Sequence, residues 1–189
     1  MDYALFRLIN NLAGRWRLLD FLGIFCAEYL LFVMAAAFIG LLIYYFKRES
    51  NSELIQILQK FKIKKKTLWF LFLSIISPFF AYFLKILISI VYFRPRPFVT
   101  LANVHQLLFK SPLDASFPSG HTVLAFALAF SVFYKNKIWG SIFLILAMLI
   151  GLGRIFVGVH YPLDIIGGIL VAFLATFIVN TITKKHLNL

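Results

Sequence analysis

Two strongly apolar runs meet at the stretch Gly153-Arg154-Ile155-Phe156-Val157-Gly158-Val159-His160-Tyr161-Pro162-Leu163-Asp164. Ionisable groups at the end of a membrane helix are costly, so their presence here indicates a functional site. His160 and Asp164 are four residues apart, a spacing that lets the carboxylate face the ring across one helical turn. Such a carboxylate fixes the tautomer of a histidine and supports the positive charge that the ring gains in a reaction. The stretch therefore predicts a helix boundary that carries a reactive histidine.

The composition indicates that the chain is embedded in a membrane. Its 189 residues are 62% hydrophobic and include 23 phenylalanines, and the mean hydropathy is +0.91. A soluble domain of this size cannot bury so much apolar surface in one core. The formal charge of +12 does not indicate nucleic-acid binding, because the basic residues lie in short segments between apolar runs. Cys26 is the single cysteine, which excludes a disulfide framework and a metal site built on paired cysteines.

The apolar runs predict an all-α fold, a polytopic membrane helix bundle that forms one domain over residues 1–189. Residues 1–20 mix apolar side chains with arginines, which is typical of a helix lying in the membrane interface. Five later runs are long enough to cross a hydrocarbon core roughly 30 Å thick. These spans are expected at about 21–46, 67–93, 118–134, 138–157 and 162–182. The start of the chain lacks a basic region, so we expect no cleaved signal peptide.

The basic residues predict the orientation of the chain. With five spans, eleven of them fall on one side of the membrane: Lys47, Arg48, Lys60, Lys62, Lys64, Lys65, Lys66, Lys135, Lys137, Lys184 and Lys185. Seven fall on the other side, with Lys85 inside the second span: Arg7, Arg15, Arg17, Arg94, Arg96, Lys110 and Arg154. Cytoplasmic segments carry the excess of Lys and Arg. We therefore expect the N-terminus outside, and the segments around Arg96, His121 and His160 together at the outer face.

These outer segments carry the groups that phosphoryl transfer needs. Transfer requires a nucleophile, an acid and cations around the phosphoryl oxygens. A neutral histidine can attack phosphorus and later be released by water, while Arg94, Arg96 and Arg154 can hold the anion. Ser119 and Gly120 stand at the start of a predicted helix, where backbone N–H groups favour a phosphate. The sequence contains no metal-type cluster, so we expect neither a metal ion nor a cofactor.

Three segments resemble the signature motifs of the type 2 phosphatidic-acid phosphatase superfamily: Arg96-Pro97, Pro118-Ser119-Gly120-His121, and Arg154 with His160 and Asp164. The chain is similar in size and helix layout to the small bacterial undecaprenyl-diphosphatase branch. The resemblance implies that His160 is the nucleophile that forms a phosphohistidine, with Asp164 as its orienting carboxylate. It also implies a general acid, His121, and the absence of a metal ion. The ligands of the phosphoryl oxygens would be Arg96, Arg154, Ser119 and Gly120.

The motifs depart from the family pattern in two places. The third motif usually opens with serine, but this chain has Gly153, so one hydroxyl hydrogen bond is expected to be missing. The first motif usually has lysine seven positions before its arginine, a position that Ser89 occupies here. Lys85 lies one turn further along the helix, about 6 Å deeper. Either Lys85 extends up to the phosphate, or Arg94 takes over its role.

Some polar residues have a structural interpretation beside the functional one. Glu28 and Lys85 lie at similar depths below the outer face, so we expect either a buried ion pair or a direct role at the diphosphate. His105 is expected to be solvated, and the basic run 60–66 to set topology without binding a ligand. Taken without the second motif, Asp164 could also be an acid in the first turn of a helix beside an interfacial histidine.

These observations predict a lipid phosphatase in the bacterial cytoplasmic membrane with its active site on the extracytoplasmic side. The resemblance implies a polyprenyl diphosphate lipid as substrate, undecaprenyl diphosphate, which is cleaved to the monophosphate and recycled for cell-wall synthesis. The alternatives within this class are phosphatases for phosphatidylglycerol phosphate, phosphatidic acid or lipid A. A non-enzymatic lipid-phosphate transporter is a further alternative, although it needs access from both faces and no oriented nucleophile.

Replacement of Asp164 by asparagine tests the predicted pair. We expect Asp164→Asn to keep its affinity for the lipid and to lose most of its turnover, because tautomer control and support of the imidazolium are lost together. Steady-state phosphate release gives kcat, and lipid binding is measured separately. Unchanged turnover would count against the pairing of His160 with Asp164.

Overall fold

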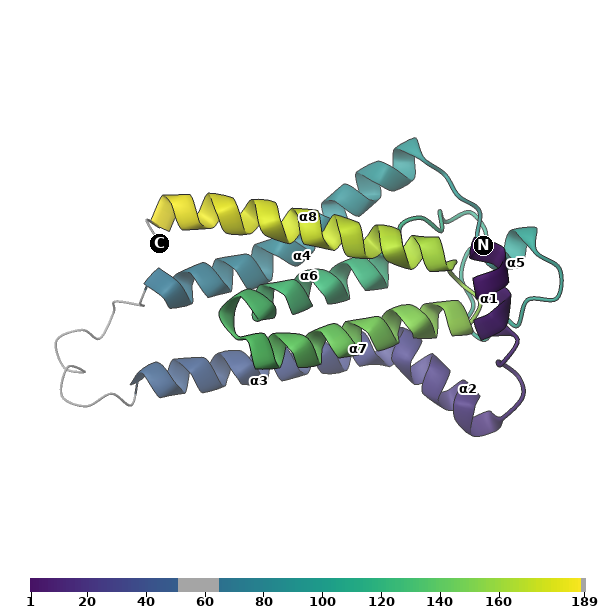
Figure 1. The fold of residues 1–189 in the computed structure, drawn as a ribbon, viewed down its shortest axis with the longest axis horizontal. Helices are drawn as coiled ribbons and strands as arrows, with labels where there is room; N and C mark the ends of the chain where they lie inside the picture. Colours follow the sequence, from purple (N-terminus) through teal and green to yellow (C-terminus); the bar gives the residue numbers. More distant parts are fainter. Residues whose placement is uncertain (51–64, 188–189) are drawn as a thin grey trace.

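The computed structural model describes residues 1–50 and 65–187, and within them all regular structure is helical. Long helices run side by side, and the short helices gather at one end of the bundle (Figure 1). The elements in chain order are α1 (Asp2–Asn10), α2 (Arg17–Ile24), the π-helical turn η1 (Phe25–Tyr29), α3 (Leu30–Ser50), α4 (Lys65–Val91), α5 (Pro97–Thr100), α6 (Gly120–Lys135), α7 (Lys137–Phe156) and α8 (Pro162–Leu187). The predicted all-α membrane bundle is confirmed. Most of the basic run at 60–66 lies outside the described residues.

Within residues 1–50 and 65–187, four helical stretches are long and apolar enough to cross a membrane: Arg17–Tyr45, Thr67–Val91, Lys137–Phe156 and Pro162–His186. The remaining predicted span, 118–134, corresponds to α6, whose 16 residues are fewer than the roughly 20 that a crossing needs. α6 packs against α4, α7 and α8. Small buried side chains on it, such as Ala125, Ala127 and Ala129, allow these helices to approach closely. Protein therefore surrounds most of α6, which starts and ends inside the bundle.

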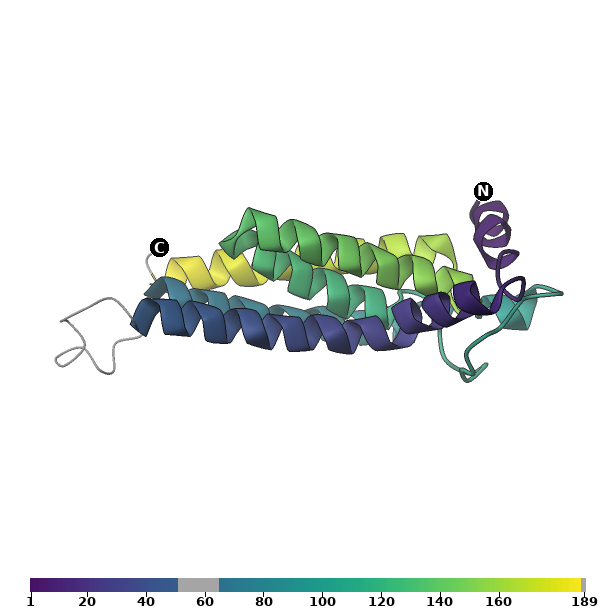
Figure 2. The same ribbon diagram turned by 90° about the horizontal axis from the view of Figure 1, so that it is seen from below.

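The N-terminal segment differs from the single interfacial helix predicted over residues 1–20. It forms two helices, α1 and α2, joined by a turn in which Gly14 has a φ of +79°. This left-handed conformation favours glycine, and it redirects the chain. α1 lies across the end of the bundle, whereas α2 leads into the first long stretch (Figure 2). The first apolar stretch consequently begins at Arg17, earlier than the predicted residue 21.

Asn10 attaches α1 to the segments that enclose the site. Its buried side-chain amide donates to the carbonyls of His105 and Phe156 at 2.9 Å each, and its oxygen accepts the N–H of His105 at 3.0 Å. Three backbone groups that no helix satisfies thereby obtain partners. The His105 side chain itself is exposed, as predicted.

Gly153 lets η1 pack directly onto α7. A Cβ atom at this position would lie 2.8 Å from the backbone nitrogen of Ala27 and 3.0 Å from the Cβ of Cys26. Contacts this short force the neighbours to move, and backbone cannot move cheaply. The serine that usually opens the third motif would meet the same obstacle. The glycine is therefore a packing requirement of this chain, set by the close approach of the first long stretch.

A matched pair of glycine substitutions tests this packing. We expect Gly153→Ala to lower the thermal unfolding midpoint in detergent by about 5 °C, since overpacking of this kind costs roughly 1–3 kcal/mol. Gly40→Ala is the control, because a Cβ atom there has no heavy atom within 4 Å. Equal midpoints for the two variants would contradict the proposed close contact between η1 and α7.

Candidate active site

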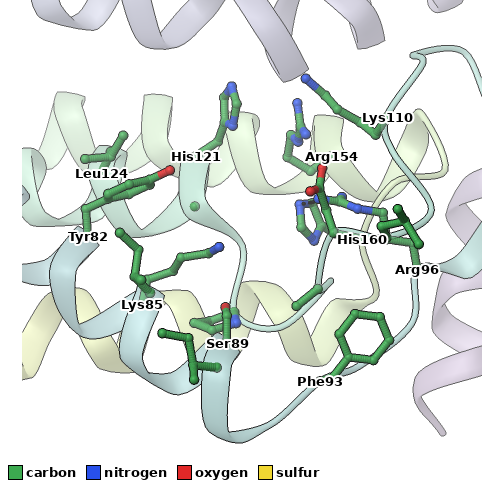
Figure 3. A pocket seen from close by; sticks show the side chains of 17 residues that line it. Tyr82, Lys85, Ser89, Phe93, Arg96, Lys110, His121, Leu124, Arg154 and His160 are labelled. Carbon is green, nitrogen blue, oxygen red and sulfur yellow. Dashed lines mark hydrogen bonds between the residues drawn. The ribbon is translucent and has the colours of Figure 1, made fainter.

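A cavity of about 560 Å³ opens where α4, α6 and α7 meet the segments that connect them. Six of the ten predicted site residues line it: Lys85, Arg96, Gly120, His121, Arg154 and His160. Arg96, Arg154 and His160 gather on one side of the hollow, and Lys85 and His121 lie on the other side (Figure 3). Residues that are far apart in the sequence thus converge on one site.

His160 presents one ring nitrogen to a carboxylate and the other to the cavity. Its side chain is buried, and its Nδ1 lies 3.5 Å from Oδ2 of Asp164. Its Nε2 lies 3.4 Å from Nη1 of Arg96, a group that only donates. A proton on Nδ1 therefore faces Asp164 and leaves the lone pair on Nε2. This tautomer is the one that a nucleophilic histidine needs.

Burial keeps the His160 ring neutral. Loss of hydration is the main cause, and the charges of Arg154 and Arg96 act in the same direction, while the hydrogen bond and charge of Asp164 oppose them. Together they lower the pKa of His160 to about 3. At neutral pH the ring consequently carries a free lone pair, the form that attacks phosphorus.

Arg96 and Arg154 bring buried, incompletely bonded cations to the cavity. Nη1 of Arg96 donates to the carbonyl of Val159 at 3.0 Å, and Nη1 of Arg154 donates to the carbonyl of Ala27 at 3.2 Å. The Nε atoms of both arginines lack a hydrogen-bond partner. Among the buried side-chain polar atoms of the described ranges, the hydroxyl of Ser77 is the only other one without a partner. Buried donors are normally bonded. Two N–H groups are thus left for an anion beside His160.

The sequence of this chain matches the family model of the PAP2 superfamily over residues 66–187. The chain belongs to the PAP2 superfamily. It is 33% identical over 178 residues to undecaprenyl-diphosphatase BcrC of Bacillus subtilis (strain 168), covering 94% of this chain and 82% of that protein. It is also 33% identical over 174 residues to the bacitracin transport permease protein BcrC of Bacillus licheniformis, covering 92% of this chain and 76% of that protein.

A solved structure supports the same assignment. The crystal structure of LpxE from Aquifex aeolicus matches with a TM-score of 0.64 and 31% sequence identity, covering 94% of this chain and 93% of that one. The family predicted from the three motifs is confirmed, and so is the prediction that the protein is a phosphatase. Its apolar helices and its relatives make it an integral-membrane lipid phosphatase.

This PAP2 site holds Asp164 in a network that the sequence did not predict. The Ser116 hydroxyl donates to Oδ2 of Asp164 at 2.5 Å and lies 3.4 Å from Nδ1 of His160. The backbone N–H of Tyr161 donates to the same carboxylate oxygen at 2.8 Å, and Arg94 donates to the other one at 2.7 Å. The one sequence signal for Ser116 was its place two residues before the second motif.

The predicted ion pair between Glu28 and Lys85 is wrong. The carboxylate of Glu28 pairs with Nη1 of Arg154 at 3.0 Å and with Nζ of Lys110 at 3.4 Å. The reason is the π-helical turn η1, which contains Glu28 and packs against α7, the helix that carries Arg154. Lys110, which the sequence suggested only as an outer-face charge, lines the cavity as well. Turns of this kind are frequent at functional sites.

The structure separates the two candidates for the missing motif lysine. Lys85 lines the cavity, whereas Arg94 does not and is bonded to the carboxylates of Asp2 and Asp164. Gly120 also lines it, but Ser119 is fully buried and outside the lining. The backbone N–H of Ser119 donates to the carbonyl of Asp164 at 3.1 Å, and its hydroxyl accepts from Thr122 at 3.0 Å. Ser119 thus connects α6 to α8, and its N–H group is not free for a phosphate.

The hydroxyl of Ser116 can be tested by truncation. We expect Ser116→Ala to lower kcat by roughly 10- to 100-fold, because a hydrogen bond to a buried charge is worth about 1.5–3 kcal/mol. Ser131→Ala is the control, since Ser131 is equally buried but donates only to backbone carbonyls. Both are measured as phosphate release from a lipid phosphate. A Ser116 variant as active as the control would remove this residue from the site.

Proposed function

We propose that the protein hydrolyses undecaprenyl diphosphate to undecaprenyl phosphate and inorganic phosphate through a phosphohistidine, without a metal ion. One observation carries the proposal: two buried guanidinium groups with unpaired Nε atoms share a cavity with a neutral histidine backed by a carboxylate. Unpaired cationic donors suit an anion with several oxygens. A histidine with a free lone pair beside that anion suits transfer of a phosphoryl group.

In the first step, Nε2 of His160 attacks the terminal phosphorus, and the bond from this phosphorus to the bridging oxygen breaks. His121, on the other side of the cavity, acts as the imidazolium, a form that the negative charge of the bound diphosphate favours. It donates its proton to that bridging oxygen, which leaves with the lipid monophosphate. Asp164 stabilises the positive charge that the His160 ring acquires. Arg96 and Arg154 neutralise the equatorial oxygens, where charge is spread during transfer.

In the second step, water attacks the phosphohistidine. His121, now neutral, accepts a proton from that water, in the reverse of its first role. The bond between Nε2 and phosphorus breaks, inorganic phosphate is released, and the ring returns to its neutral state. The buried position of His160 favours this return, because burial lowers the pKa of the ring.

The choice of lipid is supported by two features. BcrC of Bacillus subtilis, which is named an undecaprenyl-diphosphatase, aligns with nearly the whole chain. The cavity also has an apolar wall formed by Tyr82, Ile86 and Ile90 on α4 and by Phe93, two residues after it. Their exposed side chains can contact an isoprenoid chain. Phosphatidylglycerol phosphate, phosphatidic acid and lipid A present similar phosphates, so the substrate assay includes them.

We further propose that the site faces the extracytoplasmic side of the bacterial cytoplasmic membrane. The cavity is lined by the C-terminal parts of α4 and α7 and by the start of α6. The turn between α6 and α7, with Lys135 and Lys137, lies toward the opposite end of the bundle, short of the ends of α3, α4 and α8 (Figure 1). The excess of basic residues on that second side supports a cytoplasmic position for it. A transporter would need access from both ends, whereas the ionisable groups of the cavity gather at one.

The decisive experiment compares wild type with His160→Ala in detergent with EDTA. We expect phosphate release from undecaprenyl diphosphate by wild type and a loss of at least about 10³-fold in the variant, since the nucleophile itself is missing. His105→Ala is the control, because that histidine is exposed and outside the cavity lining.

The other outcomes are equally informative. Cleavage of a glycerophospholipid phosphate but not of undecaprenyl diphosphate would overturn the substrate and keep the mechanism. An active His160→Ala enzyme would overturn the mechanism. Release by intact spheroplasts from substrate added outside would support the proposed orientation.

A further inference from the structure

We propose that Arg94 and Asp2 form a positioning clamp behind Asp164, through which helix α1 holds the pair of His160 and Asp164 in place. The clamp comprises the guanidinium of Arg94 and the two carboxylates that it bridges. The proposal rests on the proposed function, because it assigns Arg94 a task in the phosphohistidine reaction. That task is different from binding phosphate.

The guanidinium of Arg94 is held by two carboxylates and an aromatic ring. Its Nη1 donates to Oδ1 of Asp164 at 2.7 Å, and its Nη2 donates to Oδ2 of Asp2. Its plane lies over the ring of Tyr161, 4.0 Å from the centroid. The second oxygen of Asp2 accepts the backbone N–H of Leu163 at 3.0 Å. Asp2 thus fixes both the arginine and the first turn of α8, which carries Asp164.

Arg94 supplies the charge that Asp164 needs before the reaction. The carboxylate of Asp164 is fully buried, and a buried charge requires a charged partner. Its two ion-pair partners within the described residues are Arg94 and His160, and His160 is neutral until phosphorus is attacked. Burial opposes the charge on Arg94, but its bonds to Asp2 and Asp164 outweigh this and raise its pKa. Arg94 therefore remains charged throughout the cycle.

The position of Arg94 argues against contact with substrate. It lines a separate cavity of about 440 Å³, among the aromatic side chains Tyr3, Tyr92 and Tyr161. Both of its terminal nitrogens already donate to carboxylates, and Asp2 would repel an incoming phosphate. Because Arg94 lies outside the lining of the cavity that holds His160 and bonds to Asp164, it is placed to orient that carboxylate.

The test separates positioning from binding by comparing kcat with KM. For Arg94→Gln we expect kcat to fall on the order of 100-fold, with KM changed less than about threefold, because the transition state alone loses stabilisation. Arg94→Lys should recover part of the loss, since it keeps the charge but cannot bridge two carboxylates. Asp2→Asn keeps an oxygen for Leu163 and should lower kcat by roughly three- to tenfold.

A double-mutant cycle tests whether Asp2 acts through Arg94. If it does, Asp2→Asn causes no further loss in the Arg94→Gln background. The control is Arg15→Gln, which removes an exposed arginine whose Nε donates to the carbonyl of Asn11, four residues earlier, and should leave kcat unchanged. If Arg94→Gln does not fold, the effects of Asp2→Asn and Arg94→Lys on kcat and KM are compared with wild type instead.

Two results would overturn the clamp. A raised KM with unchanged kcat in Arg94→Gln would make Arg94 a phosphate ligand, and multiplicative losses in the cycle would make Asp2 independent of it. Both results are ratios of the kcat or KM of a variant to that of wild type, measured on whichever lipid phosphate the enzyme cleaves. Failure on undecaprenyl diphosphate would instead overturn the proposed substrate.

Discussion

The buried negative charge of Asp164 is the constraint on which the site depends. A lone carboxylate at this depth would take up a proton rather than remain charged. Here both oxygens are bonded, Oδ2 by Ser116 and the N–H of Tyr161, and Oδ1 by Arg94. The position in the first turn of α8 adds the favourable end of the helix dipole. In the proposed mechanism, this charge lets the ring of His160 become a cation during phosphoryl transfer.

This constraint explains why the short segments at one end of the bundle are so closely connected. The partners of Asp164 come from the segment after α4, the segment before α6 and the turn before α8. α1 adds Asp2 and Asn10, which bond to Leu163 and to the segments at His105 and Phe156. The long helices fix where these segments start and end, and the hydrogen bonds fix how they meet. The site is therefore built from helix ends and from the connecting segments between them, which the bundle holds together.

The sequence predicted the parts of this protein that depend on local pattern. Runs of apolar residues predicted the helices, and the spacing of His160 and Asp164 predicted their contact across one turn. It failed where the choice among several partners depends on three-dimensional packing. Glu28 could pair with any outer-face cation, and the π-helical turn that directs it toward Arg154 leaves no mark in hydropathy. The break at Gly14 was likewise hidden inside an amphipathic segment.

Glu28 and Asp164 differ in burial and in bonding, and this difference suits a site that binds an anion. Four cations line the cavity, Lys85, Arg96, Lys110 and Arg154, and they repel one another when no anion is bound. Glu28 is partly exposed and pairs with two of these cations, so a phosphate can take over its bonds at a modest cost. Asp164 is buried and fully bonded, so no ligand can replace it. Glu28, together with Asp114 in the cavity lining, thus offsets the positive charge of the cavity, whereas Asp164 stays bonded behind His160.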